Sequence, residues 1–259
     1  MNKIRIRLLA VCVSFVLSSG LKAQFEAASN DHDDLPYYFG LTFGYNNSFL
    51  HTVRDPGFYD GYFKHVEPKG GGGIELGLMA TLKLREHWEV RTVPKLIIGG
   101  AKSLTYYFKD GVYANYGDPA ANYVATEIFS ENIKLPQTLV SVPVHIKFSS
   151  DRIGNLRAYI FGGPKYDFNL SANSEEYTKD RTIIAGLGSY PAPQFRKGSL
   201  GAELGLGVHV YLRFATISPE IRMGTSLQND HLRDADNPYS SVFNKIQQRM
   251  LSFSINIEQ

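Results

Sequence analysis

A long alternating stretch, residues 199–213, constrains the fold of this chain more than any other feature. The side chains at even-numbered positions are all aliphatic, and the odd-numbered positions, the other parity, carry mainly glycine, charged and aromatic residues. The aliphatic side chains are Leu200, Ala202, Leu204, Leu206, Val208, Val210 and Leu212. Because successive side chains of a strand point to opposite faces, this period of two predicts a β-strand with one apolar face. Soluble strands mostly have about 5–6 residues, whereas a tilted transmembrane strand needs roughly 9–11, so the length favours a membrane-crossing strand.

The same alternation recurs along the chain and predicts further strands. In 73–85 the apolar residues hold the even positions, and in 250–258 they hold the odd positions. The expected strands cover residues 37–47, 71–84, 88–98, 140–148, 156–170, 199–213, 217–223 and 250–258. The third of these could run on through Tyr106 and Phe108, beyond the break at Gly99 and Gly100.

Long and short connections alternate between the expected strands. The long ones cover 48–70, the stretch up to about 135, 171–197 and 225–245. Outer-membrane barrels combine long extracellular loops with short periplasmic turns, and a sheet in lipid must close so that no backbone edge lacks partners. We therefore expect an all-β fold: a membrane-spanning, antiparallel, up-and-down barrel of about eight strands, with both termini in the periplasm.

The N-terminus has the features of a secretory signal peptide. Lys3, Arg5 and Arg7 precede an apolar core at 8–17 and a small-residue exit at 18–23. We place cleavage after residue 23. The chain is then expected to comprise a signal peptide at 1–23, a polar periplasmic lead-in at 24–35 and an outer-membrane barrel domain at 36–259.

Cleavage there changes what the composition implies. The full sequence has 27 Lys and Arg against 25 Asp and Glu, and loss of four basic residues leaves 23 against 25, a net charge of −2. We therefore expect no nucleic-acid partner. The only cysteine, Cys12, would be removed, so the mature chain would have no thiol chemistry. The mean hydropathy of −0.20 agrees with a barrel whose strands are apolar only at alternate positions.

Four prolines conflict with regular strands. Pro94, Pro143, Pro164 and Pro219 fall inside the expected strands. Each removes a backbone donor from the ladder of hydrogen bonds. We expect bulges or local register changes at these positions.

The polar parity of the strands is expected to face a filled lumen. The interior of an eight-stranded barrel is just wide enough for side chains to fill it, so a porin is not expected. An ion-pair network is predicted there, formed by Glu75, Glu89, Arg91, Lys95, His145, Arg157, Lys165, Asp167, Glu203, His209, Glu220 and Arg222. The opposite orientation would place these groups in lipid, at about 2–4 kcal/mol for each Arg or Lys at the midplane.

The same inward faces allow a catalytic alternative. His145 or His209 could act as a base, with Glu203 orienting it. Ser141 or Ser218 would then be the nucleophile of a small lipid-modifying enzyme. No nucleophile elbow, zinc-binding pair or phosphate-binding glycine loop supports this alternative. We expect no catalytic, cofactor-binding or metal-binding residues and no enzyme; a structural or adhesive barrel similar to OmpA is a further alternative.

Two features outside the strands remain. The acidic run 31–34 is interpreted as part of the solvated lead-in, because adjacent residues of an extended tail do not converge on one ion.

Aromatic residues gather in the long loops: Tyr59, Tyr62, Phe63, Tyr106, Tyr107, Tyr113, Tyr116, Tyr123 and Tyr190. These loops could bind a partner, or the aromatic side chains could pack on one another as a lid.

Several segments resemble the PorT family of Bacteroidetes outer-membrane proteins, which is linked to type IX secretion and gliding motility. The similar segments are 36–41 (PYYFGL), 88–91 (WEVR), 94–97 (PKLI), 141–152 (SVPVHIKFSSDR), 162–167 (GGPKYD), 218–222 (SPEIR) and 244–250 (NKIQQRM). The resemblance covers nearly the whole mature chain and is weakest in the long loops.

The resemblance implies an accessory role in exporting cargo proteins across the outer membrane. This role would depend on contacts with other secretion proteins and not on catalysis, and the family offers no catalytic residues to carry over. The expected partners are outer-membrane lipid and secretion-system proteins, with no small-molecule substrate identified.

Overall fold

The computed structural model describes residues 35–60, 63–109, 130–135, 137–172, 181–184 and 188–259. The predicted signal peptide and the acidic run 31–34 lie outside these residues. Among the described residues, no helix is long and apolar enough to cross a membrane.

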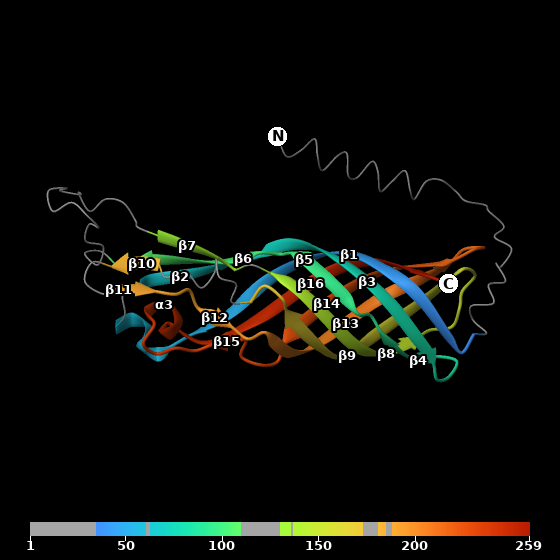
Figure 1. Cartoon of the computed structure of the whole chain (residues 1–259). Coiled ribbons are helices and arrows are strands. Elements are labelled where there is room, and N and C mark those ends of the chain that lie inside the picture. The colour runs from blue at the N-terminus through green and yellow to red at the C-terminus, as the bar shows by residue number, and fades with distance from the viewer. Residues whose placement is uncertain (1–34, 61–62, 110–129, 136, 173–180, 185–187) are drawn as a thin grey trace, which may run out of the picture.

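Nine strands form one closed antiparallel sheet (Figure 1). They are β1 (Tyr37–Arg54), β3 (Gly71–Lys83), β4 (Trp88–Thr92), β5 (Lys95–Gly99), β8 (Thr138–Ser149), β9 (Leu156–Asn169), β13 (Gly198–Tyr211), β14 (Thr216–Ser226) and β16 (Phe243–Glu258). The strand order is β1-β16-β14-β13-β9-β8-β4-β3-β5, and pairing of β1 with β3 closes the ring. Because β4 and β5 follow one another between the same neighbours, the ring has eight positions, which confirms the predicted up-and-down barrel.

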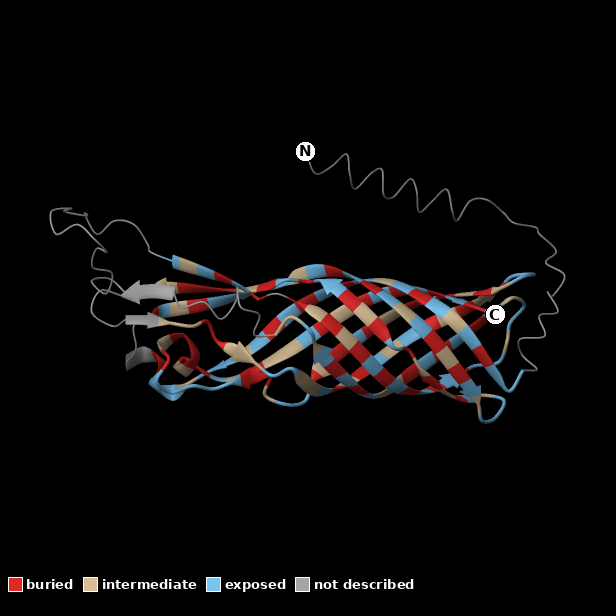
Figure 2. Cartoon of the chain, in the orientation of Figure 1, coloured by how far each residue is buried: buried red, intermediate tan, exposed pale blue. Residues whose placement is uncertain are grey.

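The two faces of the barrel wall follow the alternation in the sequence. Figure 2 shows buried and exposed residues as a chequered pattern along the strands. On the outer face Leu204 is 67% exposed and Leu78 is 65% exposed, whereas Glu75 on the inner face is fully buried. An exposed aliphatic surface of this kind is stable in hydrocarbon, so the pattern is that of a membrane-spanning wall.

The strand prolines do not cause the bulges or register changes that we expected. Pairing with β3 keeps one register on both sides of Pro94, from Ala80↔Thr92 to Gly77↔Lys95. Pro143 and Pro219 also lie in unshifted registers. The prolines instead interrupt the pairing, because the missing N–H removes only its own hydrogen bond. Thus 93–94 separates β4 from β5, and the pairs of 144–145 with β9 are absent.

Gly163 explains how β9 stays close to β8 beside Pro164. A Cβ atom at Gly163 would lie 2.0 Å from the Val144 carbonyl oxygen. Only glycine allows the two backbones to approach this closely without displacement.

β1 and β16, which pair with each other in the barrel wall, both extend beyond the predicted limits. β1 was expected to end at 47 and continues to Arg54, while β16 begins at Phe243 instead of 250. In this extension the inner face becomes apolar, since Leu50 and Ile246 are buried. Phe49 and Val53 on the outer face of β1 are also apolar, so the alternation of polarity is lost where the strands leave the membrane-spanning part, and for this reason the sequence pattern did not predict their continuation.

The long connections fold into a second layer of structure beyond the barrel, here called the outer region. It contains a three-stranded sheet of β2 (Phe63–Lys69), β6 (Lys102–Phe108) and β7 (Ser130–Leu135). The other elements are η2 (Pro56–Asp60), β10 (Arg181–Ile184), β11 (Gly188–Tyr190), β12 (Gln194–Phe195), β15 (His231–Leu232) and α3 (Pro238–Ser241). Figure 1 places these elements at the end of the barrel opposite the C-terminus.

The third expected strand does not run on through Tyr106 and Phe108. Gly99 and Gly100 have positive φ angles of 84° and 73°, and the chain leaves the barrel wall at this point. Glycine adopts this backbone conformation without the steric penalty of other residues. Residues 102–108 therefore form a new strand, β6, in the sheet of the outer region.

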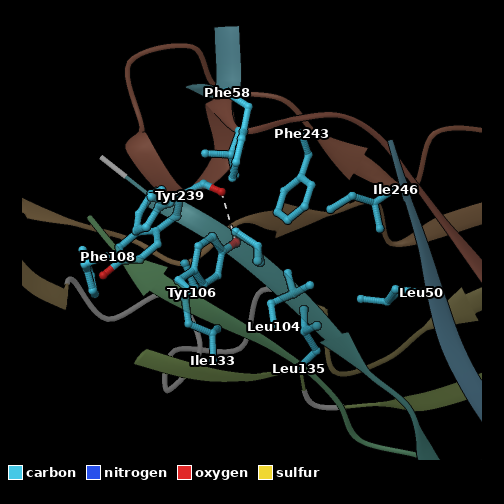
Figure 3. Packing of buried hydrophobic residues seen from close by; sticks show 14 residues of the cluster. Leu50, Phe58, Leu104, Tyr106, Phe108, Ile133, Leu135, Tyr239, Phe243 and Ile246 are labelled. Carbon is cyan, nitrogen blue, oxygen red and sulfur yellow. Dashed lines mark hydrogen bonds between the residues drawn. The ribbon is translucent and has the colours of Figure 1, made fainter. Parts of the chain in front are cut away.

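The outer region has its own hydrophobic core. Figure 3 shows side chains from β2, β6, β7, α3 and the extensions of β1 and β16 packed together. The Phe63 ring packs against Tyr106 and Tyr239, with ring centroids 5.0 and 5.5 Å away, and these two rings are 5.0 Å from each other. The outer region is thus a packed structure and not a set of independent loops.

Candidate functional site

All the residues predicted for the lumenal network are buried inside the barrel. None of the twelve is more than 9% exposed. They come from β3, β4, β5, β8, β9, β13 and β14, because the inward positions of a strand recur at every second residue. The structure therefore brings together side chains that are far apart in the sequence.

The first contact of the network spans the full width of the lumen. Arg91 on β4 forms a buried ion pair with Glu220 on β14, and these strands occupy opposite positions of the ring. The Tyr159 hydroxyl donates a hydrogen bond of 2.7 Å to the same carboxylate. The Arg91 guanidinium also lies 4.0 Å from the centroid of the Phe161 ring.

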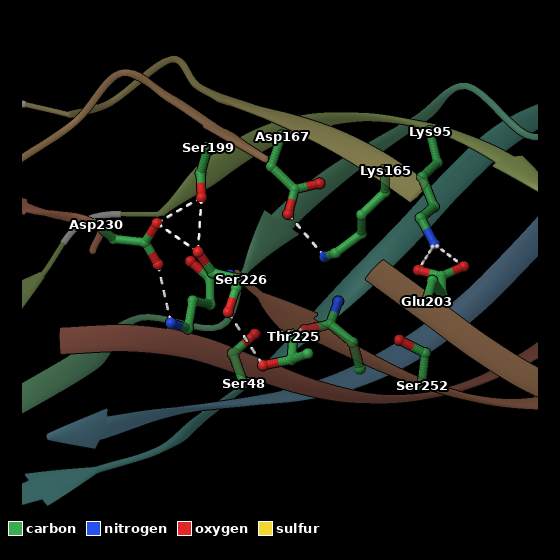
Figure 4. Close-up of polar contacts among 12 residues, drawn as sticks. Ser48, Lys95, Lys165, Asp167, Ser199, Glu203, Thr225, Ser226, Asp230 and Ser252 are labelled. Atoms are coloured by element: carbon green, nitrogen blue, oxygen red, sulfur yellow. Dashed lines mark hydrogen bonds and ion pairs between the residues drawn. The ribbon is translucent and has the colours of Figure 1, made fainter. Parts of the chain in front are cut away.

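A second group of contacts lies around two carboxylates. Arg222 donates to Glu75 at 2.5 Å, and Ser252 donates to the other oxygen of Glu75 at 2.6 Å. Lys95 lies 3.0 and 3.2 Å from the two oxygens of Glu203 (Figure 4). His145 Nε2 is 3.3 Å from Glu203. These contacts join three or more strands across the lumen.

Shorter links lie nearer the wall. Lys147 pairs with Glu89 at 2.6 Å, and Lys165 pairs with Asp167 at 2.7 Å. Arg157 is buried near the same face. Paired charges of this kind avoid the cost of isolated buried ions, so the network both fills the lumen and remains compatible with folding.

The lumen contains further buried polar residues beside the twelve predicted ones. Tyr38 donates to Glu89 at 2.7 Å, Tyr159 donates to Glu220, and Glu258 is fully buried. All three have the inward parity of their strands. The alternation places Tyr38 and Tyr159 on the inward faces of their strands, but it does not show that they join the ionic groups through hydrogen bonds.

The catalytic alternative has an unsuitable geometry at His209. Ser218 Oγ is 2.7 Å and Glu258 is 3.5 Å from the same ring nitrogen, Nδ1. A serine–histidine–carboxylate triad needs the nucleophile and the carboxylate at different ring nitrogens. The Ser141 hydroxyl is buried and has no hydrogen-bond partner among the described residues. Within those residues, no group of three His, Cys, Asp or Glu could hold a metal ion.

The aromatic loop residues divide into two groups. Phe63 and Tyr106 are 1% and 0% exposed and belong to the core of the outer region, so the partner-surface interpretation is wrong for both. Tyr107 and Tyr190 are half-buried, and the Tyr107 ring stacks on His65 with centroids 4.0 Å apart. The side chain of Tyr59, and the whole of Tyr62, Tyr113, Tyr116 and Tyr123, lie outside what the structure describes.

Comparisons with known proteins found a family model and several similar solved structures. The family model described as outer membrane protein beta-barrel domain matches residues 23–230. Similar solved structures include OprG from Pseudomonas aeruginosa, which is 11% identical with a TM-score of 0.43 over 86% of this chain and 93% of OprG. AlkL in lipid bilayers is 12% identical with a TM-score of 0.38 over 86% of this chain and 88% of AlkL. Neisserial surface protein A is 10% identical with a TM-score of 0.36 over 85% and 96% of the respective chains.

No curated protein matches the chain. The family match nevertheless extends over most of the sequence, and the structure has the closed antiparallel sheet that the family description names. This protein therefore belongs to the outer membrane protein beta-barrel domain family and is a protein of the outer membrane.

Proposed function

We propose that this barrel is an accessory component of type IX secretion, required for the export of cargo proteins and acting through protein contacts. The resemblance of its strands to the PorT family suggests the pathway. The observation that supports a contact role is the filled lumen, in which the Arg91–Glu220 pair joins opposite walls. Opening a path for cargo would separate such pairs, and an uncompensated buried charge costs about 3–5 kcal/mol.

The outer region supplies a surface for such contacts. Its apolar side chains are buried in a common core, while Lys64, Glu67, Asn132 and Lys134 are exposed on the three-stranded sheet. A packed region of this kind can present its surface groups in fixed positions, which lowers the entropic cost of binding. In this proposal, secretion proteins bind the outer region or the barrel wall, and no reaction takes place in the lumen.

We propose that the short turns and both termini face the periplasm, after removal of the signal peptide. The connections at 84–87, 150–155 and 212–215 are short, and the outer region lies at the other end of the barrel. This arrangement follows the usual asymmetry of outer-membrane barrels.

Deletion of the gene in the source organism tests the proposal. Cargo proteins with type IX sorting signals should accumulate in the periplasm, and the intact gene should restore export. Normal export in the deletion strain would contradict the secretion role and favour a structural or adhesive barrel. Passage of purified cargo through liposomes that contain this protein alone would contradict the contact mechanism.

Single-cysteine labelling tests the orientation, because the chain has one cysteine, Cys12, within the predicted signal peptide. Lys134→Cys on β7 should react with a membrane-impermeant maleimide added to intact cells. Asp151→Cys, in the turn after β8, should react only after the outer membrane is permeabilised. The reverse result would contradict the proposed orientation.

Substitution of the lumenal histidines separates the contact role from catalysis. His145→Gln and His209→Gln should support normal export as long as the barrel folds. Loss of export by either folded variant would instead favour the catalytic alternative.

A further inference from the structure

A pocket lies where the barrel meets the outer region. Its polar side chains come from separate segments: Lys102 begins β6, Gln137 follows β7, and Gln248 lies on β16. The segments are brought together by the pairing of Lys102 with Leu135 and of Leu50 with Gln248. The pocket has an empty volume of about 440 Å³, including its opening to solvent.

Several polar groups that line this pocket lack partners. Lys102 and Gln137 are 4% and 6% exposed. Among the described residues the Lys102 side chain forms no hydrogen bond and no ion pair, and both polar side-chain atoms of Gln137 are buried without a hydrogen-bond partner. The Nε2 atom of Gln248 is also buried and has no hydrogen-bond partner among the described residues. Since most buried polar groups in proteins are hydrogen-bonded, three unpartnered donors around one pocket indicate a missing acceptor.

The carboxylate that lines the pocket is already engaged. Asp230 accepts hydrogen bonds from the hydroxyls of Ser226, at 2.7 Å, and Ser199 (Figure 4). Its other oxygen accepts from the backbone N–H of Gln248 at 2.9 Å. Asp230 is thereby held in place without an ion pair to Lys102. An external anion could therefore supply the partner that Lys102 lacks.

One part of the pocket lining is apolar, while Asn169 and Ser171 add further polar groups. Leu50, Leu135 and Phe195 form the apolar part. A ligand that fits both the unpartnered donors and the apolar side chains of the pocket must combine an anionic acceptor with a hydrocarbon portion. We propose that this pocket binds a short aliphatic carboxylate, whose oxygens accept from Lys102, Gln137 and Gln248 and whose chain contacts Leu50, Leu135 and Phe195. This proposal is independent of the secretion role.

The charges around Lys102 make binding sensitive to pH. Burial lowers the pKa of Lys102 to about 7, while Asp230 and Asp167 oppose this shift and Lys165 adds to it. A bound carboxylate favours the ammonium form, so binding should be accompanied by proton uptake near neutral pH. Affinity should therefore be higher at pH 6 than at pH 8.

The test uses the full mature barrel in a nonionic detergent with ¹⁵N-labelled glutamine side chains. Hexanoate is titrated at constant ionic strength while the side-chain amide signal of Gln137 is followed, after assignment with Gln137→Leu. Hexanoate should cause a saturable shift. Hexanol and hexylammonium, which have the same chain without the carboxylate, should cause none.

Two matched variants locate the binding charge. Lys102→Met should weaken hexanoate binding at least tenfold and should raise the unfolding temperature, because an unpaired buried ammonium is removed. Lys134→Met, on the exposed face of the same sheet, should bind as the unmodified protein does. The proposal is wrong if hexanol shifts the Gln137 signal as strongly as hexanoate, if hexanoate gives no saturable shift, or if folded Lys102→Met binds equally well.

Discussion

The barrel and the outer region bury opposite kinds of side chain. In the barrel, charged side chains such as Arg91 and Glu220 are inside and aliphatic side chains such as Leu204 are outside. In the outer region, Phe63 and Leu104 are inside and Lys134 is outside. The difference teaches that the surrounding solvent, hydrocarbon in one case and water in the other, decides which parity of a strand is buried. Four predictions test this contrast.

Breaking the central lumenal pair should have the largest effect. Glu220→Leu leaves Arg91 without its carboxylate in a fully buried position. We expect the free energy of unfolding of the barrel to fall by about 3–5 kcal/mol. Urea unfolding in lipid vesicles measures this loss. The double variant Arg91→Met, Glu220→Leu should recover most of the stability; if it does not, the ion pair is not the cause.

An apolar truncation should be equally severe in the outer region but should leave the barrel intact. Leu104 is fully buried in the core of that region, so Leu104→Ala should destabilise it by about 2–5 kcal/mol. Added protease should then cut the outer region, while the barrel keeps its heat-modifiable mobility in gels. Simultaneous loss of both would show that the two regions unfold as one unit.

One charge placed on two surfaces gives the most direct comparison. Leu204→Arg places a guanidinium on the lipid-facing wall, and we expect destabilisation of about 2–4 kcal/mol if this position is near the midplane. Asn132→Arg places the same group on the exposed sheet of the outer region, where surface substitutions change stability by about 0.5 kcal/mol or less. Urea unfolding of both variants measures the two losses of stability. Equal losses would contradict the assignment of Leu204 to lipid and of Asn132 to water.

The smallest expected effect depends on pH and concerns the outer region alone. His231 is 2% exposed, and burial, with a contribution from Arg233, lowers its pKa from 6.5 to about 4. Between these values the unfolded chain binds a proton that the folded chain does not bind, so stability falls as the pH falls from 6.5 towards 4. Hydrogen exchange of the outer region should accelerate over this window.

A matched pair of variants identifies the group that titrates. His231→Gln should reduce the pH dependence of exchange, whereas His65→Gln, whose side chain is more exposed at 37%, should preserve it. Unchanged pH dependence in His231→Gln would assign the effect to another group.

The sequence predicted the wall of the barrel well because a period of two is a local property. All twelve residues that the inward parity assigned to the network are buried, although their partners were unknown. The ion-pair partners of these residues could not be predicted. Parity gives the face of the strand on which a side chain lies, but it does not give the position of that side chain along the barrel axis or around the ring. Thus Glu220 was placed in the lumen, but its pairing with Arg91 required the register of the sheet.

Packing of the loop aromatic residues on one another was one of two alternatives, but the strands of the outer region were not predicted, and its elements show why. Its central sheet pairs β2, β6 and β7, which are separated by long stretches of sequence. β6 does alternate, with Leu104, Tyr106 and Phe108 at one parity, but a period of two does not show which sheet a strand joins, so these residues were read as a possible extension of the third expected strand. Likewise, the prolines were expected to shift the register because local rules describe one strand, whereas the neighbouring strands hold the register in place.

The seam between β1 and β16 has a consequence for the order of assembly. It joins the two ends of the chain, and the Thr42 hydroxyl donates at 2.9 Å to Asn256, 214 residues later. No shorter portion of the chain can complete the ring, because β1 and β14 would both keep an open edge until β16 arrives. The ring can therefore close only when β16 has been added, and until then β1 and β14 each present an open strand edge that other chains could pair with.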